Sequence, residues 1–284
     1  MSTVNPISSE ETSRLLPDAS AADIDAAMAY EKIFVPALFQ YWPGHLISSA
    51  GVQSGDRTLD IACGTGVLTR QLTAIVGEAP APVGLDISAG MLDVAHRLNP
   101  AIEWRQGDAT ALPFEDASFD RILCQYGLMF FTDRAKALAE MARVLVRGGR
   151  LALSVWNSLE NNPGFLTKVD VLDRVAGHRA GDALRSPFCL GDREALWQIA
   201  DRAGLHDIEI ETLTGEARFR NMREFVEAEV RGWLPVMDVH LSEDVIAAVH
   251  AECRENLGRY ENGPGGSLAF PVSAHIVTAS HTRE

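Results

Sequence analysis

The sequence lacks several features that would point to particular classes of protein. Its 284 residues include only four cysteines, which lie far apart and form no Cys-x-x-Cys pair. This excludes a disulfide scaffold and gives no pattern for a metal site, so we expect free thiols in a reducing compartment and no bound metal. No run of 18 apolar residues exists, and residues 1–13 carry neither a basic residue nor an apolar core. We therefore expect neither a membrane span nor a signal peptide, and predict a cytoplasmic protein.

Positive charge is also scarce. The chain has 25 Lys and Arg against 39 Asp and Glu, a net charge of −14, and no three basic residues are consecutive. A field of this sign repels nucleic-acid phosphates and anionic lipid headgroups. We expect neither a nucleic-acid nor a membrane partner. The hydrophobic share of 46% and charged share of 23% are typical of a globular protein with a sizeable core.

The chain divides into three regions by composition and by the spacing of apolar residues. Residues 1–20 are rich in Ser, Thr, Glu and Pro and are predicted to be a mobile tail. Residues 21–55 show helical apolar spacing and are expected to form short helices that cover a larger body. Residues 56–284 would form that body, with helical insertions at about 157–191 and 216–262 acting as lids.

From residue 58 onward, short apolar strands alternate with amphipathic helices. Strands are predicted over residues 58–63, 82–87, 102–108, 121–126, 150–156 and 208–213, with a terminal strand over 268–272 and 275–279. Helices are predicted over residues 67–76, 91–98, 133–146 and 193–203. The helix over 133–146 is expected to start at the cap residue Thr132 and to stop at Gly148 and Gly149. This alternation predicts a Rossmann-like, doubly wound α/β sheet with right-handed crossovers.

The first strand runs directly into a Gly-x-Gly turn. Glycines at Gly64 and Gly66 let the backbone adopt positive φ and let a ligand approach without a Cβ in the way. In open α/β sheets ligands bind beyond the carboxyl ends of the strands. A dinucleotide-binding turn would have a third glycine, but Thr69 occupies that position. The turn therefore points away from NAD and FAD.

Three acidic residues stand at the predicted ends of neighbouring strands. Asp86 ends the second strand, where a carboxylate can accept both hydroxyls of a ribose. Asp108 ends the third and can accept from the amino group of an adenine. Asp60, near the end of the first strand, suits a cationic part of a ligand. Together these acids would repel a pyrophosphate and attract a ligand with an ammonium and a sulfonium group.

This set of motifs resembles the class I S-adenosylmethionine-dependent methyltransferases, especially the small-molecule branch that includes the ubiquinone and menaquinone C-methyltransferases. The matching segments are residues 60–66, 84–88, 107–109, 119–123 and 143–151. The resemblance implies a seven-stranded sheet with an antiparallel last strand, and S-adenosylmethionine as the cofactor. The segment 216–262 differs from the quinone enzymes, which leaves the acceptor and its accepting atom open.

The resemblance also implies which residues form the site. The implied cofactor-binding residues are Tyr30, Phe34, Asp60, Ala62, Gly64, Gly66, Asp86, Ile87, Met91, Asp108, Ala109, Gln125 and Tyr126. Candidates for lining the acceptor, from the strand ends and the lid, are Tyr126 again, Met129, Phe130, Trp156, Asn157 and Trp233. No general base stands out, because in-line methyl transfer needs mainly alignment and exclusion of water.

Structural roles and other functions compete with these assignments. Asp60 is equally explained as an acid that bonds its own loop, Tyr30 and Phe34 as core packing, and Trp233 as part of a lid seam. The same cofactor fits an enzyme that catalyses a cyclisation or rearrangement without methylation. An NAD(P)-dependent oxidoreductase would use the same turn, and a non-enzymatic interaction module would leave the acids without a purpose. A homodimer is one open oligomeric state.

Overall fold

The computed structural model describes residues 19–77 and 79–281. Residues 1–18 of the predicted tail lie outside the described residues. Ser20, which the prediction placed in the tail, is the N-cap of the first described helix and accepts a hydrogen bond from the backbone of Asp23. None of the described helices is long and apolar enough to cross a membrane.

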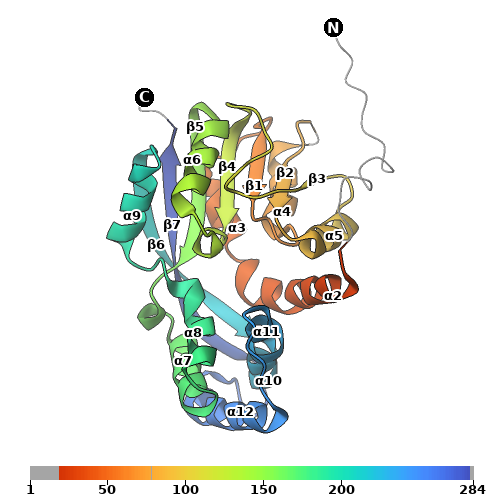
Figure 1. Cartoon of the computed structure of the whole chain (residues 1–284), viewed down its shortest axis with the longest axis vertical. Coiled ribbons are helices and arrows are strands. Elements are labelled where there is room, and N and C mark those ends of the chain that lie inside the picture. The colour runs from red at the N-terminus through yellow and green to blue at the C-terminus, as the bar shows by residue number, and fades with distance from the viewer. Residues whose placement is uncertain (1–18, 78, 282–284) are drawn as a thin grey trace.

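A seven-stranded sheet with the order β3-β2-β1-β4-β5-β7-β6 forms the body (Figure 1). Its strands are β1 Thr58–Ile61, β2 Val83–Asp86, β3 Glu103–Gln106, β4 Phe119–Gln125, β5 Leu145–Trp156, β6 His206–Phe219 and β7 Leu268–Ser280. The pairs among β1 to β5 are parallel, whereas β7 runs antiparallel to both β5 and β6. This confirms the predicted Rossmann-like fold. The strand order reverses between β1 and β4, which is where such sheets bind ligands.

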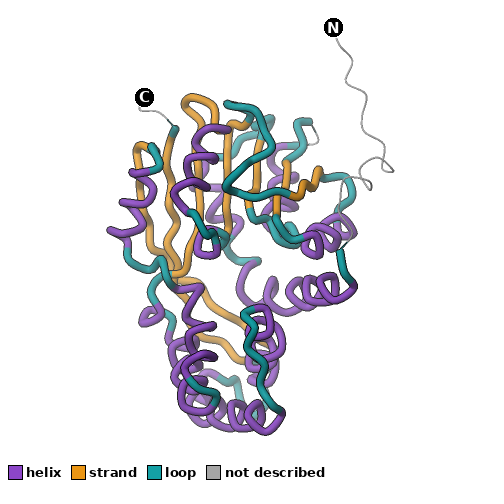
Figure 2. The backbone as a smooth tube through the Cα atoms, in the orientation of Figure 1, coloured by secondary structure: helices purple, strands orange, loops and turns teal. Residues whose placement is uncertain are grey.

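Helices cover both faces of the sheet (Figure 2). The helices are α2 Ala21–Ala29, η1 Tyr30–Phe39, α3 Pro43–Ala50, α4 Val67–Val76, α5 Ala89–Leu98, η2 Leu128–Phe130, α6 Arg134–Val144, η3 Leu159–Asn161, α7 Pro163–Val175, α8 His178–Arg185, η4 Ser186–Phe188, α9 Arg193–Arg202, α10 Met222–Glu227, η5 Ala228–Trp233, α11 Leu234–Val236, α12 Glu243–Leu257 and η6 Gly258–Tyr260. Adjacent residues of β4 show how the faces divide. Leu123 packs with α3 and α4, whereas Ile122 and Cys124 belong to the larger core that includes α6.

Two local predictions were wrong. Helix α6 is capped by Asp133, whose carboxylate accepts from the backbone of Lys136, rather than by Thr132. It ends at Val144 because the chain enters β5 at Leu145, and Gly148, with φ of 73°, lies inside that irregular strand start. A glycine pair after a helix is a stop signal in isolation, but pairing with β4 already determines where this helix ends.

Strand β6 is much longer than the predicted 208–213, whereas β7 joins the two predicted parts of the terminal strand into one. Their pairing runs from His206 opposite Ser280 to Phe219 opposite Leu268, so residues 216–219 belong to the sheet rather than to an insertion. In Figure 1 their far end reaches the group of helices α7, α8, α10 and α12, which form one helical lobe below the sheet. Phe270 of β7 anchors this lobe, because a Cβ added at Gly164 of α7 would lie 2.3 Å from its ring.

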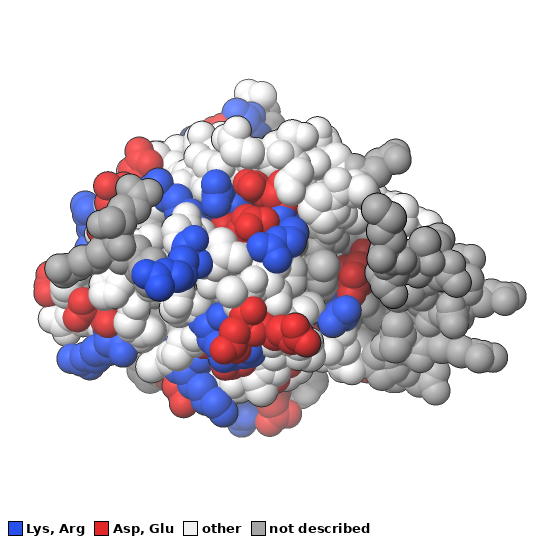
Figure 3. Space-filling model, turned by 90° about the horizontal axis from the view of Figure 1, so that it is seen from above, with Lys and Arg blue, Asp and Glu red and all other residues white. Residues whose placement is uncertain are grey.

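Acidic and basic side chains are interspersed on the face shown in Figure 3. Many are paired, such as Arg143 with Glu140 and Asp116. The net negative charge is thus spread over the surface rather than gathered in one place on that face.

Candidate functional site

The glycine turn after β1 lies at the reversal of strand order. Gly64 has φ of 55° and Gly66 has φ of 85°, both in the left-handed region. Gly66 is required by packing, since a Cβ there would lie 2.3 Å from the ring of Trp104. A Cβ at Gly64 would meet only the ring of Tyr30, at 3.8 Å. Gly64 is therefore the position that leaves space on the ligand side, and Trp104 of β3 is a neighbour that sequence reasoning missed.

Asp86 joins the end of β2 to this turn. Its Oδ2 accepts from the backbone N–H of Gly64 at 2.8 Å, and its Oδ1 accepts from that of Ser88 at 2.8 Å. Burial raises the pKa of Asp86, and backbone hydrogen bonds from Ser88, Gly64 and Ile87 oppose the rise. A carboxylate has about four lone-pair sites, so acceptor capacity remains. The carboxylate is thus held in place with acceptor capacity to spare.

Asp60 is fully buried at β1 and only half of its carboxylate has a partner. The Thr69 hydroxyl donates to Oδ2 at 2.6 Å, so the residue that replaces the third glycine supports this acid. Oδ1 is buried without a partner among the residues that the structure describes. Burial raises the pKa of Asp60 to about 7. An unpaired buried carboxylate oxygen is costly unless a ligand provides a donor or a cation.

Two more unpartnered polar atoms lie at the end of β4, next to β1. The Gln125 amide donates through Nε2 to the carbonyl of Phe39 at 3.2 Å, but its Oε1 is buried without a partner within the described ranges. The Tyr126 hydroxyl is in the same state. Tyr126 and Ala62, at the ends of β4 and β1, both have φ of 56°. Such backbone conformations are rare for residues other than glycine and tend to occur at functional sites.

The helical segment η1 covers the glycine turn and is fastened to it. Glu31 accepts from the Thr65 hydroxyl at 2.5 Å and pairs with Arg70 at 2.9 Å. These contacts hold the neighbouring Tyr30 over Gly64, and burial together with the charge of Asp86 raises the pKa of its hydroxyl. The structure thus brings the predicted residue Tyr30 onto the turn.

A row of aromatic rings leads from the turn towards the helical lobe. Tyr30 stacks on Phe39 with ring centres 5.4 Å apart, and Phe39 lies 5.5 Å from Tyr126. Tyr126 stacks on Trp156 at 4.2 Å, and Phe188 follows at 6.3 Å. Sequence reasoning found three members of this row but missed Phe39 and Phe188, which lie at ordinary-looking positions in helices.

The residues predicted around the adenine lie on the other side of the turn. Ile87 is 67% exposed, which is unusual for isoleucine. Its side chain is therefore available to contact a flat apolar group of a ligand. Met91 is half-buried and Ala109 is buried. Asp108 faces solvent and accepts from the backbone of Thr110, and this bond lowers its pKa. The backbone of this region is adjacent to that of Asp86, since the N–H of Gly107 donates to the Asp86 carbonyl.

The predicted acceptor residues divide into two groups. Phe130 is half exposed, and its ring lies 5.3 Å from that of Trp233 in the lobe. Met129 is buried beside it. Phe34 reaches the same lobe segment, since a Cβ at Gly232 would lie 3.5 Å from its ring. The other group holds Tyr126 and Trp156, which stack on each other in the aromatic row, and Asn157.

The Asn157 amide is used within the fold. Its Nδ2 donates to the Ser273 hydroxyl at 2.9 Å, and its Oδ1 accepts from the backbone of Ser158 at 2.7 Å. This leaves Asn157 little to offer an acceptor. Among the described residues no group of three or more His, Cys, Asp and Glu side chains is arranged to hold a metal ion.

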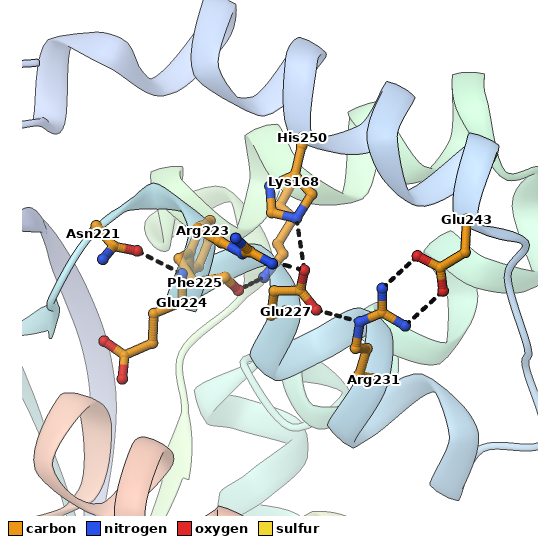
Figure 4. A network of polar contacts seen from close by, with 9 residues as sticks. All are labelled: Lys168, Asn221, Arg223, Glu224, Phe225, Glu227, Arg231, Glu243 and His250. Atoms are coloured by element: carbon orange, nitrogen blue, oxygen red, sulfur yellow. Dashed lines mark hydrogen bonds and ion pairs between the residues drawn. The ribbon is translucent and has the colours of Figure 1, made fainter. Parts of the chain in front are cut away.

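Charged groups hold the lobe together (Figure 4). Glu227 lies between Arg231 and His250, and Arg231 also pairs with Glu243 of α12 at 2.7 Å. Lys168 is completely buried, donates to the carbonyl of Phe225 and lies 4.0 Å from Glu229. Burial lowers the pKa of Lys168 to about 8. No sequence pattern indicated that Lys168 and Glu229 would form a buried pair.

Comparison with known proteins places these features in a family. A family described as a methyltransferase domain matches residues 59–153. The ubiquinone/menaquinone biosynthesis C-methyltransferase of Francisella philomiragia is 33% identical over 198 residues, which cover 63% of this chain and 78% of that protein. The 2-phytyl-1,4-naphthoquinone methyltransferase of Thermosynechococcus vestitus is 42% identical over 119 residues, or 41% of this chain and 53% of that one.

A solved structure supports the fold over nearly the whole chain. Phosphoethanolamine N-methyltransferase 2 of Haemonchus contortus, in complex with S-adenosylmethionine, superposes with a TM-score of 0.57 and 19% identity. The superposition covers 92% of this chain and 57% of that one. At this identity the likeness concerns the fold alone.

Proposed function

This chain belongs to the class I S-adenosylmethionine-dependent methyltransferases, and we propose that it methylates a small, planar, largely apolar molecule of the quinone type. Two features support this acceptor. The names of the Francisella philomiragia and Thermosynechococcus vestitus relatives refer to quinones. A row of aromatic rings also leads from the glycine turn to the lobe. Flat apolar molecules pack well against such rings. The predicted cytoplasmic location and the oligomeric state stay predictions.

The observation that carries the cofactor site is the pair of unpartnered acceptor atoms, Asp60 Oδ1 and Gln125 Oε1. Both are buried at neighbouring strand ends, and both need N–H donors. The ammonium of a methionine group supplies such donors, whereas a pyrophosphate would face repulsion from two acids and an amide oxygen. We propose that these atoms hold the ammonium end and that Asp86 accepts the ribose hydroxyls. The residues present therefore fit S-adenosylmethionine.

Bound S-adenosylmethionine supplies a methyl group on a positively charged sulfur. The acids around the turn stabilise that charge, and the faces of Tyr30 and Phe39 add attraction for a cation. The aromatic row keeps water out and aligns the acceptor for in-line attack. With the cofactor bound, the acceptor's electron pair would form the bond to the methyl carbon, and the carbon–sulfur pair would stay on sulfur. For methylation at a ring carbon, the proton of that carbon would pass to water once the product has left the site.

Calorimetric titration with S-adenosylmethionine, S-adenosylhomocysteine and NAD tests the cofactor site, using the wild type and Asp86→Ala. Loss of two charge-assisted ribose bonds should weaken binding of both sulfur ligands by about 30- to 1000-fold. Asp116→Ala is the matched control, because that carboxylate is exposed and pairs with Arg143 on the surface. Binding of NAD in place of the sulfur ligands, or an unchanged Asp86→Ala variant, would contradict the site.

A further inference from the structure

Tyr126 combines three features, of which its backbone conformation and its unpaired hydroxyl do not follow from packing. Its backbone has φ of 56°, an unfavourable conformation for a bulky residue, and its N–H is fixed by the carbonyl and hydroxyl of Ser154 at 3.1 and 3.2 Å. Its ring is 5% exposed and stacks on Trp156 at 4.2 Å. Its hydroxyl is buried without a hydrogen-bond partner in the described part of the chain. A phenylalanine would serve packing alone without leaving a buried hydroxyl unpaired.

The surroundings of this hydroxyl differ from those of the other buried groups at the switch point. The pKa values of Tyr30, Cys63 and Cys124 are all raised in part by the charges of Asp60 and Asp86. The pKa of Tyr126 is raised well above its ordinary value by burial alone, without a contribution from either acid. The ring that carries the Tyr126 hydroxyl lies within the aromatic row, next to Phe39 and Trp156.

The neighbours of the ring agree with this placement. Trp156 and Phe39 flank it, and Trp42 meets it edge-on at 5.8 Å. These rings provide apolar surface but no strong acceptor for the hydroxyl proton. Because the hydroxyl stays protonated at neutral pH, it is available as a donor. An oxygen atom of a molecule that packs against these rings would give the hydroxyl the acceptor that it lacks.

We propose that the Tyr126 hydroxyl binds the methyl acceptor, by donating a hydrogen bond to a carbonyl or phenolic oxygen carried on a planar ring. This inference rests on the proposed function and adds the residue that would recognise a ring oxygen of the quinone-type acceptor. The bond would fix the ring's rotation in its plane and so decide which ring atom faces the cofactor. Tyr126 is then a residue for acceptor specificity rather than one that holds the methionine end of the cofactor.

Tyr126→Phe tests the inference because it removes only the hydroxyl. The probes are 1,4-naphthoquinone and naphthalene, which share a flat two-ring frame and differ in the two oxygens. Binding is followed by quenching of tryptophan fluorescence, with and without S-adenosylhomocysteine. The control variant is Tyr41→Phe, at a ring that is 48% exposed and outside the row described above. Urea denaturation and calorimetric titration with S-adenosylhomocysteine complete the set.

The wild type and Tyr41→Phe should prefer naphthoquinone to naphthalene, and Tyr126→Phe should lose about 3- to 10-fold of that preference. Its affinity for S-adenosylhomocysteine should stay within about twofold, and its unfolding midpoint should not fall, because an unpaired hydroxyl is removed. Weakened S-adenosylhomocysteine binding with unchanged naphthoquinone binding would place the hydroxyl on the cofactor and overturn the inference. A lowered midpoint, or equal preference in all variants, would also overturn it. Failure of the wild type to bind S-adenosylhomocysteine would count against the proposed function, while the titrations without it still decide the role of Tyr126.

Discussion

Cofactor binding should depend on pH through Asp60. This carboxyl is buried, and its pKa of about 7 means that roughly half of the unliganded protein carries it protonated near neutrality. A ligand ammonium pairs with the ionised form only. Binding therefore draws the proton off, and affinity should fall as the pH drops below 7. The groups that face Asp60 are the Thr69 hydroxyl and the charge of Asp86, with Tyr30 close by.

The size of the effect follows from the ionised fraction. With a pKa of about 7, roughly 10% of Asp60 is ionised at pH 6 and roughly 90% at pH 8, so the dissociation constant should differ about ninefold between them. Stability should change in the opposite sense. The folded pKa lies above the ordinary 3.8, so the folded state holds an extra proton between these values. The stabilisation by this group is complete below pH 3.8 and is lost by about pH 7. The free energy of unfolding should therefore fall by about 4 kcal/mol across this range.

Calorimetry measures the pH dependence of binding, and urea unfolding measures the pH dependence of stability. Titrations with S-adenosylhomocysteine at pH 6, 7 and 8, each in two buffers of different ionisation enthalpy, give the affinity and the number of protons released. For each ligand bound, the wild type should release close to one proton at pH 6 and only a small fraction of a proton at pH 8. Asp60→Asn keeps an acceptor for Thr69 but cannot ionise, so it should bind weakly at every pH, release no proton, and unfold at higher urea concentration than the wild type at pH 8. Equal affinity at all three pH values, without proton release, would refute the assignment of Asp60 to the ammonium.

Three further outcomes are expected. Glu31→Gln should speed cofactor dissociation in stopped-flow experiments by loosening η1, and the exchanged pair Glu31→Arg with Arg70→Glu should restore the rate; no recovery would mean that this ion pair does not hold the cover. Gly66→Ala should lower the free energy of unfolding by about 1–3 kcal/mol in urea because of the contact with Trp104, and an unchanged value would disprove that packing. The pKa of Lys168, lowered to about 8 from 10.5, means that stability should rise between these pH values by up to about 3 kcal/mol, and that Lys168→Met should flatten this rise in urea titrations.

The sequence predicted the parts of the site that depend on local order along the chain. The first strand, the glycine turn and Asp86 follow one another at fixed positions, so alternation of strands and helices was enough to bring them to one edge of the sheet. The seven-strand fold came from the resemblance rather than from periodicity. Whether Asp86 and the other predicted side chains bind the cofactor stays a prediction that the titrations above decide.

The sequence could not show contacts between residues far apart in the chain. Thr69 looked like a missing glycine, and only the fold shows its bond to Asp60. Trp104 packs on Gly66 from a different strand, and the buried Lys168 pairs across the lobe, so no local spacing records either contact. The end of α6 at Val144 likewise depends on pairing between β4 and β5 rather than on the glycines that follow.

Product analysis tests the proposed function most directly. The protein is incubated with S-adenosylmethionine carrying a labelled methyl group and with the hydroquinone form of 1,4-naphthoquinone, and both products are measured by mass spectrometry. The account predicts labelled methyl on the acceptor and S-adenosylhomocysteine in equal amounts, with both reduced together in Asp86→Ala. Conversion of the acceptor without any S-adenosylhomocysteine, or without label on the product, would contradict it.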